Sequence, residues 1–320
     1  MVSVKNGRLA QSLPTKLGHA YLHIPAIMAA IRTDYPHKPC KNEHMPFDPA
    51  EQAKISLVTL AQLAQAGTWQ LALAHDRAQH LLIWITRGQG VALLDGARRG
   101  IGTHNAVFIP ARHLMAIDLG RQAFGMALVV PGDTSLSLPQ APHHLRIRDG
   151  AAQTELTQLM DAMGREQSAQ RPLYQSAMLA ISELMAIWLH RQVAAQITDI
   201  SQPPDPDTAA RRLSRLWSQH LVSHYATPIT MADHAAELGV TPTHLTRISK
   251  SQTGRTAARL LGERQLHAAQ QLLITTDVAI LDIARHLGFG SAAYFTRFIK
   301  QHTGKTPTAL RQMARTSSTR

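Results

Sequence analysis

Two kinds of apolar pattern divide the upstream part of the chain. Between about residues 52 and 132, short apolar runs alternate with turn residues such as Gly and Asp-Gly. Short strands at regular spacing with such turns predict a compact β-barrel or β-sandwich. From about 151 to 195 the apolar positions take helical spacing, which predicts helices near Ala152–Arg165 and Leu173–Ala195. These helices would either pack on the β-domain or form a dimer seam, and the pattern leaves both alternatives open.

After Ala209 the pattern is helical throughout, and it repeats. The segment Leu238–Gly254 matches Leu287–Gly304, with one extra residue in the turn of the second copy. A Thr-Arg pair, a Lys three residues further on and a closing Thr-Gly are identical in both copies. A match of this extent indicates a duplicated structural unit rather than coincidence.

Each copy has the pattern of a helix-turn-helix unit. A glycine supplies the positive φ of the turn, and a Thr or Ser then caps the second helix. One helix over Thr256–Thr275 joins the units, and at about 1.5 Å per residue it spans about 30 Å. Successive major grooves on one side of B-DNA are about 34 Å apart. The predicted helix pairs are Met231–Leu238 with Pro242–Thr253, and Val278–Leu287 with Ala292–Thr303.

One face of each second helix carries polar residues at spacings of three, four and seven, and therefore forms one stripe. Early positions of a recognition helix reach base edges, whereas later lysines suit phosphates. Because Ala293 offers only apolar contact, we expect the second unit to read less sequence than the first. The expected base-reading residues are Thr243, Thr246, Arg247, Ala293, Thr296 and Arg297. The expected phosphate contacts are Thr241, Lys250, Ser291 and Lys300.

Charge supports this interpretation once it is divided along the chain. From Ala209 onward there are 15 Lys and Arg against 5 Asp and Glu, whereas the first 208 residues hold the remaining 18 and 16. Nearly all of the net charge of +12 therefore lies in the last third. A compact domain that is so basic indicates a polyanionic partner, most commonly nucleic acid. A merely soluble cationic surface, or a helical bundle without DNA, would leave the repeat and the stripe unexplained.

Composition sets the remaining limits. The apolar fraction of 44% is that of a globular protein, and no apolar run reaches 18 residues, so we expect no membrane span. The first ten residues lack a secretory pattern, and the single Cys40 excludes a disulfide framework, so we expect a cytoplasmic protein. The prediction is an α+β protein with a β-rich domain over 1–198, a Pro-rich and acidic linker over 199–208 and a helical domain over 209–320.

The residues Ala284–Arg311 resemble the signature of the AraC/XylS family of bacterial transcription regulators. The resemblance lies in Gly-Phe in the turn, Tyr-Phe-x-Arg-x-x-Lys in the helix, and then Gly-x-Thr-Pro and Leu-Arg. Less closely, residues 80–90 and 107–110 resemble the cupin-like effector and dimerisation domain of that family. The resemblance implies a small-molecule effector, a homodimer on double-stranded promoter DNA and activation through contact with RNA polymerase.

The β-domain departs from metal-binding cupins. Leu81 stands where such cupins have a Glu and Met115 where they have a later His, so we expect no metal, no cofactor and no catalytic site. We interpret His75, His80 and His113 as hydrogen-bonding or pocket-lining groups, and the remaining histidines show no metal spacing. The alternatives are a cupin-type metal enzyme fused to a DNA-binding module, and an effector-free repressor. The expected wall of an effector pocket is Trp84, Phe108, His113 and Met115, with an ordinary barrel core as the alternative.

Overall fold

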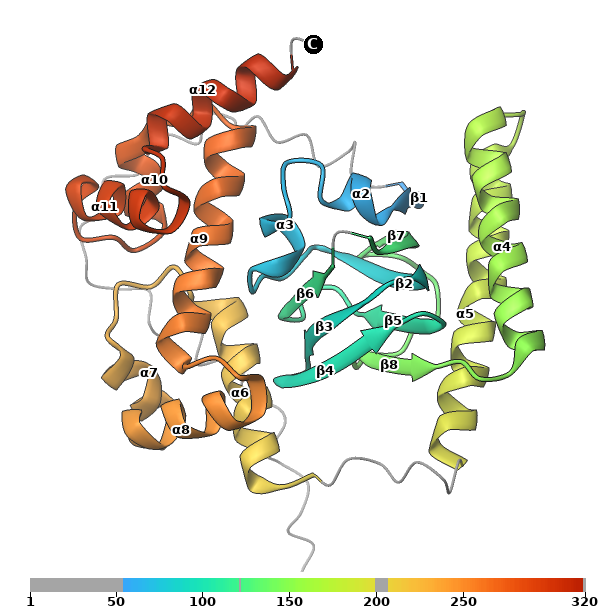
Figure 1. Ribbon diagram of the computed structural model, residues 1–320, viewed down its shortest axis with the longest axis horizontal. Coiled ribbons are helices and arrows are strands. Elements are labelled where there is room, and N and C mark those ends of the chain that lie inside the picture. Colours follow the sequence, from blue (N-terminus) through green and yellow to red (C-terminus); the bar gives the residue numbers. More distant parts are fainter. Residues whose placement is uncertain (1–53, 121, 199–206, 319–320) are drawn as a thin grey trace, which may run out of the picture. The chain divides into compact units, whose positions relative to one another are not determined.

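The computed structural model describes residues 54–120, 122–198 and 207–318, and all of them belong to one compact unit. Cys40 and most of the predicted linker, residues 199–206, lie outside the described residues. The chain combines antiparallel sheets with a helical C-terminal part (Figure 1), which confirms the predicted α+β class.

The upstream strands form two antiparallel sheets. One sheet has five strands in the order β1-β7-β2-β5-β8, and the other has the order β4-β3-β6. The central strand β2 pairs with both β5 and β7, so that Leu82 lies opposite Phe108 and Leu128. The strands are β1 Ser56–Thr59, β2 Gln79–Arg87, β3 Gln89–Leu94, β4 Ala97–Gly102, β5 Asn105–Ile109, β6 Met115–Leu119, β7 Phe124–Pro131 and β8 His143–Arg146.

Strand β2 is buried on both faces because it lies between two cores. Its side chains alternate, as those of any strand do. Leu81 and Ile83 join the apolar cluster between the two sheets, whereas Leu82 and Trp84 join a second cluster on the outer face of the five-stranded sheet. The prediction of a β-barrel or β-sandwich is therefore met by two sheets that pack face to face, and a continuous apolar run rather than an alternating one marks the central strand.

Two long helices, α4 (Gly150–Ala169) and α5 (Tyr174–Thr198), cover the outer face of the five-stranded sheet (Figure 1). Asp149 caps α4 by accepting from the backbone N–H groups of Ala151 and Ala152. Trp188 of α5 is fully buried and donates its indole N–H to the carbonyl of Ala152 at 3.0 Å. Both predicted upstream helices are confirmed, each a few residues longer than the pattern indicated.

The C-terminal part is helical throughout. Its helices all follow residue 207, whereas α4 and α5 end by residue 198 and two short helices, α2 (Leu60–Leu63) and α3 (Trp69–Ala72), precede β2. No helix among the described residues is both long and apolar enough to cross a membrane. The C-terminal helices are α6 Ala209–His224, α7 Met231–Glu237, α8 Pro242–Thr253, α9 Ala257–Thr275, α10 Ile280–His286, α11 Ala292–Thr303 and α12 Pro307–Ser318.

Buried polar contacts join α9 to the loop before β2. Arg264 lies 2.6 Å from a carboxylate oxygen of Asp76, and both side chains are almost inaccessible. The same guanidinium stacks on the ring of Tyr225, 3.7 Å from its centroid. One turn further along α9, His267 stacks on His75 with 4.1 Å between ring centroids. Contacts of this kind are costly to break singly because the remaining partner stays buried without compensation.

The stacked histidines make the stability of the fold depend on pH. Burial, assisted by the positive charges of Arg264 and Arg77, lowers the pKa of His267 to about 3. In an unfolded chain a histidine titrates near pH 6.5. Between these values the unfolded state takes up a proton that the folded state does not. His267 alone should therefore lower the free energy of unfolding as the pH drops below 6.5, by about 2 kcal/mol at pH 5.

Urea unfolding of the full chain at pH 7, 6 and 5 measures this effect. The variant His267→Gln should show a shallower dependence on pH, whereas His286→Gln, which changes an exposed histidine of α10, should keep the original one. An identical pH dependence in the parent chain and in His267→Gln would contradict the assignment.

Candidate nucleic-acid interface

Helix α9 organises two helix-turn-helix units. In its N-terminal half, Leu260 shares a buried cluster with Leu245 of α8. In its C-terminal half, Leu273 shares another buried cluster with Phe295 of α11. The helices α8 and α11 therefore lie at opposite ends of α9 (Figure 1). The 19 residues of α9 correspond to about 28 Å of helix.

The first unit consists of α7 and α8, and its turn forms for local reasons. Thr230 and Asp233 make a capping box at the start of α7, with the Thr230 N–H donating to the Asp233 carboxylate at 2.8 Å. Gly239 has φ +69°, a conformation that favours glycine. The Thr241 hydroxyl then accepts from the His244 N–H at 3.2 Å and caps α8. The predicted helix, turn and cap are all confirmed.

The second unit, α10 and α11, repeats this arrangement with one more residue in its turn. Gly288 has φ +77°, and a Cβ there would lie 2.6 Å from the carbonyl oxygen of Ala226. No side chain is therefore tolerated at this position without movement of the backbone. The additional residue is Gly290, which has open space around it. Ser291 caps α11 by accepting from the Tyr294 N–H at 3.2 Å.

The structure brings the predicted base-reading residues of each unit onto one helix face. In each helix the side chains on the opposite side are buried, namely Leu245 and Ile248 in α8 and Phe295 and Ile299 in α11. Thr246 and Thr296 are half-buried at the edge of the stripe. The exposed members are Thr243, Arg247 and Lys250 in α8, and Ala293, Arg297 and Lys300 in α11.

The residues predicted to contact phosphate fall into two groups. Lys250 and Lys300 are exposed near the ends of α8 and α11. Thr241 and Ser291 use their hydroxyl oxygens as helix caps. Each hydroxyl retains its hydrogen for donation to an acceptor outside the protein. The cap and a phosphate contact are therefore compatible at these two positions.

Two exposed residues next to the stripe were not among the DNA contacts predicted from the sequence. Tyr294 is 55% exposed at the third position of α11, and His244 is exposed at the corresponding position of α8. The imidazole of His244 lies 3.2 Å from the Arg247 guanidinium and so helps to place it. Their position in the sequence could have identified them, because both lie three residues after the helix cap, where a recognition helix first meets the groove.

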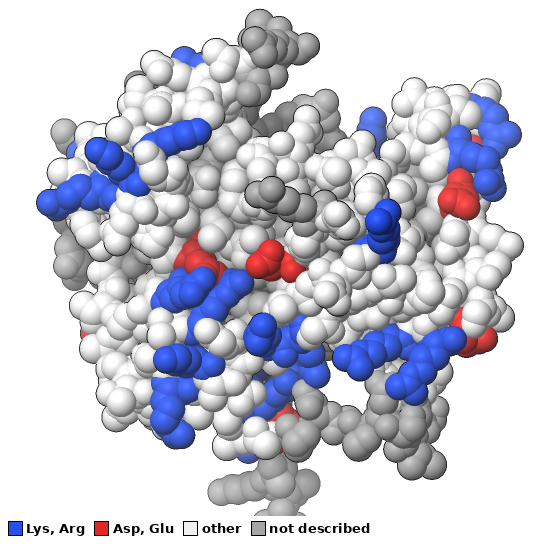
Figure 2. Space-filling view, in the orientation of Figure 1, with Lys and Arg blue, Asp and Glu red and all other residues white. Residues whose placement is uncertain are grey.

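Positive charge gathers on the helical domain. Figure 2 shows Lys and Arg side chains over the region of α8 and over the region of α11, whereas acidic groups on this face are few. Such a distribution attracts a polyanion along both units rather than at a single point.

The residues predicted to line an effector pocket do not share one site. Trp84 and Phe108 face α4 and α5 on the outer side of the sheet, whereas Met115 lies between the two sheets. His113 lies in the turn before β6, with its Nδ1 3.1 Å from the Ala111 carbonyl oxygen. Met115 is 1% exposed, as expected for an ordinary core residue.

Phe108 and Trp84 each line a hollow of the β-domain, but the two hollows are different ones. One is apolar and lies between the five-stranded sheet and α5, where Phe108 and His80 meet Met185 and Leu189. The other is more polar and opens beside Trp84. Its further lining residues are Thr86, His104, Gln153, Thr154, Thr157 and Gln158.

The three histidines considered for a cupin-type metal site hold other contacts. His75 is fully buried against His267, with its Nδ1 2.8 Å from the Leu73 carbonyl oxygen. The Nδ1 atom of His80 accepts from the Ala111 N–H at 3.1 Å. In the part of the chain that the structure describes, these histidines do not form a group of three ligands around one point.

Comparison with known proteins agrees with this geometry. Residues 234–313 match a protein family described as a helix-turn-helix domain. The matched segment extends from α7 through both units into α12. It therefore contains every residue that we assign to the exposed stripes.

Three curated relatives illustrate the extent of the similarity. The bifunctional transcriptional activator/DNA repair enzyme AdaA of Bacillus subtilis is 32% identical over 104 residues, which are 32% of this chain and 49% of AdaA. The HTH-type transcriptional activator RhaS of Klebsiella pneumoniae is 24% identical over 256 residues, or 74% of this chain and 87% of RhaS. The arabinose operon regulatory protein of Escherichia coli is 29% identical over 136 residues, or 42% of this chain and 44% of that protein. The chain thus spans about half the length of two of these relatives and most of the third.

Proposed function

We propose that this chain is a transcription regulator of the AraC/XylS family and that it places α8 and α11 in adjacent major grooves of promoter DNA. The observation that carries the proposal is the pair of exposed polar stripes at opposite ends of α9. The length of α9, about 28 Å, approaches the 34 Å or so between successive grooves on one side of B-DNA.

Each stripe offers a different reading chemistry. Arg247 and Arg297 can each fork onto the O6 and N7 atoms of a guanine, and threonines can meet a thymine methyl or donate to a base. Ala293 offers only a methyl group where the first unit has Thr243. Lys250 and Lys300 suit phosphates, because their flexible stems carry a point charge. The first unit therefore sets most of the sequence preference, and the second adds affinity.

The β-sandwich is proposed to be the effector domain. The more polar hollow beside Trp84, with a volume of about 270 Å³, is the better candidate for a small effector, because the apolar hollow beneath α5, at about 10 Å³, has room for only about one water. An effector there would act on β2, and Asp76, three residues before β2, pairs with Arg264 of α9. The domain boundaries at 198 and 209 remain predictions within one compact unit.

A homodimer through α5 completes the proposal. Leu184 and Ile187 lie one turn apart on this helix and are 52% and 47% exposed, beside the buried Met185 and Trp188. Exposed aliphatic residues at helical spacing favour a helix–helix seam. The partners would then be a second copy of the chain, duplex DNA and RNA polymerase, in the cytoplasm. AdaA and RhaS are both named as activators, and most of the relatives are transcription regulators rather than enzymes.

The DNA-reading assignment is tested at Arg247. Purified full-length protein first selects its preferred fragments from genomic DNA. The variant Arg247→Ala should bind the selected site about 5- to 150-fold more weakly, which corresponds to about 1–3 kcal/mol for one bidentate base contact. Its affinity for an unrelated duplex should fall much less. Both affinities are measured by fluorescence anisotropy at one fixed salt concentration.

The matched control is Arg171→Ala, which removes the same charge from an exposed arginine of the α4–α5 loop. This variant should retain the affinity of the parent chain for both duplexes. If Arg247→Ala lost the same factor on the selected and the unrelated DNA, Arg247 would be a phosphate contact and not a base reader.

The proposed dimer interface is tested by introducing positive charges into it. The double variant Leu184→Lys/Ile187→Lys should sediment as a monomer at micromolar concentration, whereas the parent chain should sediment as a dimer. Ala151→Lys/Gln158→Lys places the same two charges on exposed positions of α4 and should remain dimeric. A parent chain that sediments as a monomer, or a dimer that survives the α5 variant, would rule out this seam.

A further inference from the structure

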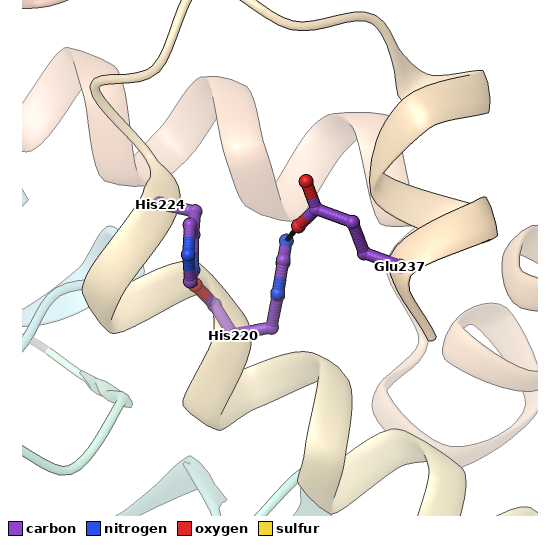
Figure 3. Close-up of side chains that lie close together, drawn as sticks. All are labelled: His220, His224 and Glu237. Atoms are coloured by element: carbon purple, nitrogen blue, oxygen red, sulfur yellow. Dashed lines mark hydrogen bonds and ion pairs between the residues drawn. The ribbon is translucent and has the colours of Figure 1, made fainter. Parts of the chain in front are cut away.

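A cluster of histidines joins α6 to α7 within the first helix-turn-helix unit. His220 and His224 lie one turn apart on α6, and Glu237 reaches them from the end of α7 (Figure 3). One potential ligand atom from each of the three side chains lies within 4.8 Å of the others. One of these approaches joins His220 Nε2 and Glu237 Oε2 at 3.5 Å.

A fourth side chain adjoins this cluster. His234 of α7 is fully buried, and its Nδ1 lies 2.8 Å from the same Nε2 atom of His220. Its other ring nitrogen, Nε2, is buried without a hydrogen-bond partner. A buried nitrogen without a partner is costly, so its presence calls for a compensating interaction.

The internal repeat shows that this arrangement is particular to the first unit. The position of His234 is occupied in the second unit by Ile283, which is buried in the core of that unit. The position of Glu237 is occupied by His286. An aliphatic side chain therefore satisfies this core position, and the helix-turn-helix geometry does not require an imidazole there.

The orientation of His224 is also that of a metal ligand. Its Nδ1 lies 3.1 Å from the carbonyl oxygen of His220, which favours the tautomer with the proton on Nδ1. The Nε2 lone pair is then free for an ion, as in zinc sites where a carbonyl orients the histidine. The His220 side chain is 8% exposed and that of Glu237 is 49% exposed, so the site is sheltered but reachable from solvent.

We propose that His220, His224 and Glu237 bind a divalent late first-row transition ion such as Zn²⁺, with a water as the fourth ligand. Two imidazoles, one carboxylate and a water are a ligand set that Zn²⁺ accepts in tetrahedral geometry. In such a site neighbouring donor atoms are about 3.3 Å apart. The imidazoles of His220 and His224, which are stacked with ring centroids 4.3 Å apart, would turn toward a shared point when the ion binds. We expected no metal from the sequence, because the β-domain histidines depart from the cupin pattern and the remaining histidines, including the His220–His224 pair, were interpreted as lacking metal spacing.

The ion would act by crosslinking α6 to α7. Two ligands come from α6 and one from α7, so an ion at this point fixes the first helix of the unit against the rest of the domain. The crosslink stabilises the fold irrespective of DNA. Its effect on DNA affinity rests on the proposed function, because α7 supports the turn that places α8.

The test uses the untagged full chain, freed of metal by chelator and dialysis. Addition of Co²⁺ should give visible d–d bands of tetrahedral intensity that saturate at one equivalent, and Zn²⁺ should displace them. An excess of Zn²⁺ of about 100 times its Kd should raise the melting temperature by roughly 3–5 °C. Both readouts are independent of DNA.

Two variants locate the site. His224→Gln and Glu237→Gln change accessible side chains and leave the buried core intact, and each should lose the tetrahedral bands and the thermal shift. His286→Gln changes the exposed histidine at the corresponding position of the second unit and should keep both. The proposal is overturned if the parent chain shows no tetrahedral Co²⁺ spectrum, or if His224→Gln shows the same spectrum and thermal shift as the parent.

A third readout separates the two proposals. If metal binds as expected, removal of Zn²⁺ should weaken binding to the selected DNA about tenfold or more in the parent chain, with no effect in Glu237→Gln. Loss of all DNA preference with intact metal binding would refute the DNA-binding proposal and leave the metal site standing.

Discussion

Burial of both halves of α9 is the constraint on which the rest of the DNA-binding domain depends. Leu260 and Leu273 are fully buried at its two ends, each in contact with a different helix-turn-helix unit. Burial of such a side chain contributes about 1.5–3 kcal/mol relative to its exposure. Because one continuous helix serves both cores, the separation and rotation of α8 and α11 are set by a single rigid element. The exposed stripes acquire their geometry from this shared core.

The two units have diverged in their interiors while they keep the same backbone. The first unit buries Ser249 where the second buries Ile299, and the Ser249 hydroxyl donates to the Arg255 carbonyl at 2.8 Å. It also buries His234 where the second has Ile283. A core that contains polar side chains is stable only when those side chains have hydrogen-bond partners. Without these partners it is less stable than an aliphatic core. We therefore expect a bound ligand to stabilise the first unit more than the second.

The sequence predicted the helical domain more accurately than the β-domain, for identifiable reasons. Caps such as Thr241 and Ser291 and the turn glycines act locally, so the limits of α8 and α11 were correct to the residue. Strand β4 has no continuous apolar run in the sequence because Arg98 and Arg99 interrupt it, and only pairing with β3 makes it a strand. The separation of Phe108 and Met115 likewise depends on which sheet face each occupies. The cluster around His220 was missed because two of its members come from another helix, although the spacing of His220 and His224 was visible.

The central claim is that α9 holds two recognition helices against one face of the duplex. Hydroxyl-radical footprinting of the full chain on its selected site tests this claim most directly. The account predicts two protected patches whose centres are about 10 base pairs apart on the same face. A single patch, or two patches on opposite faces of the duplex, would contradict it.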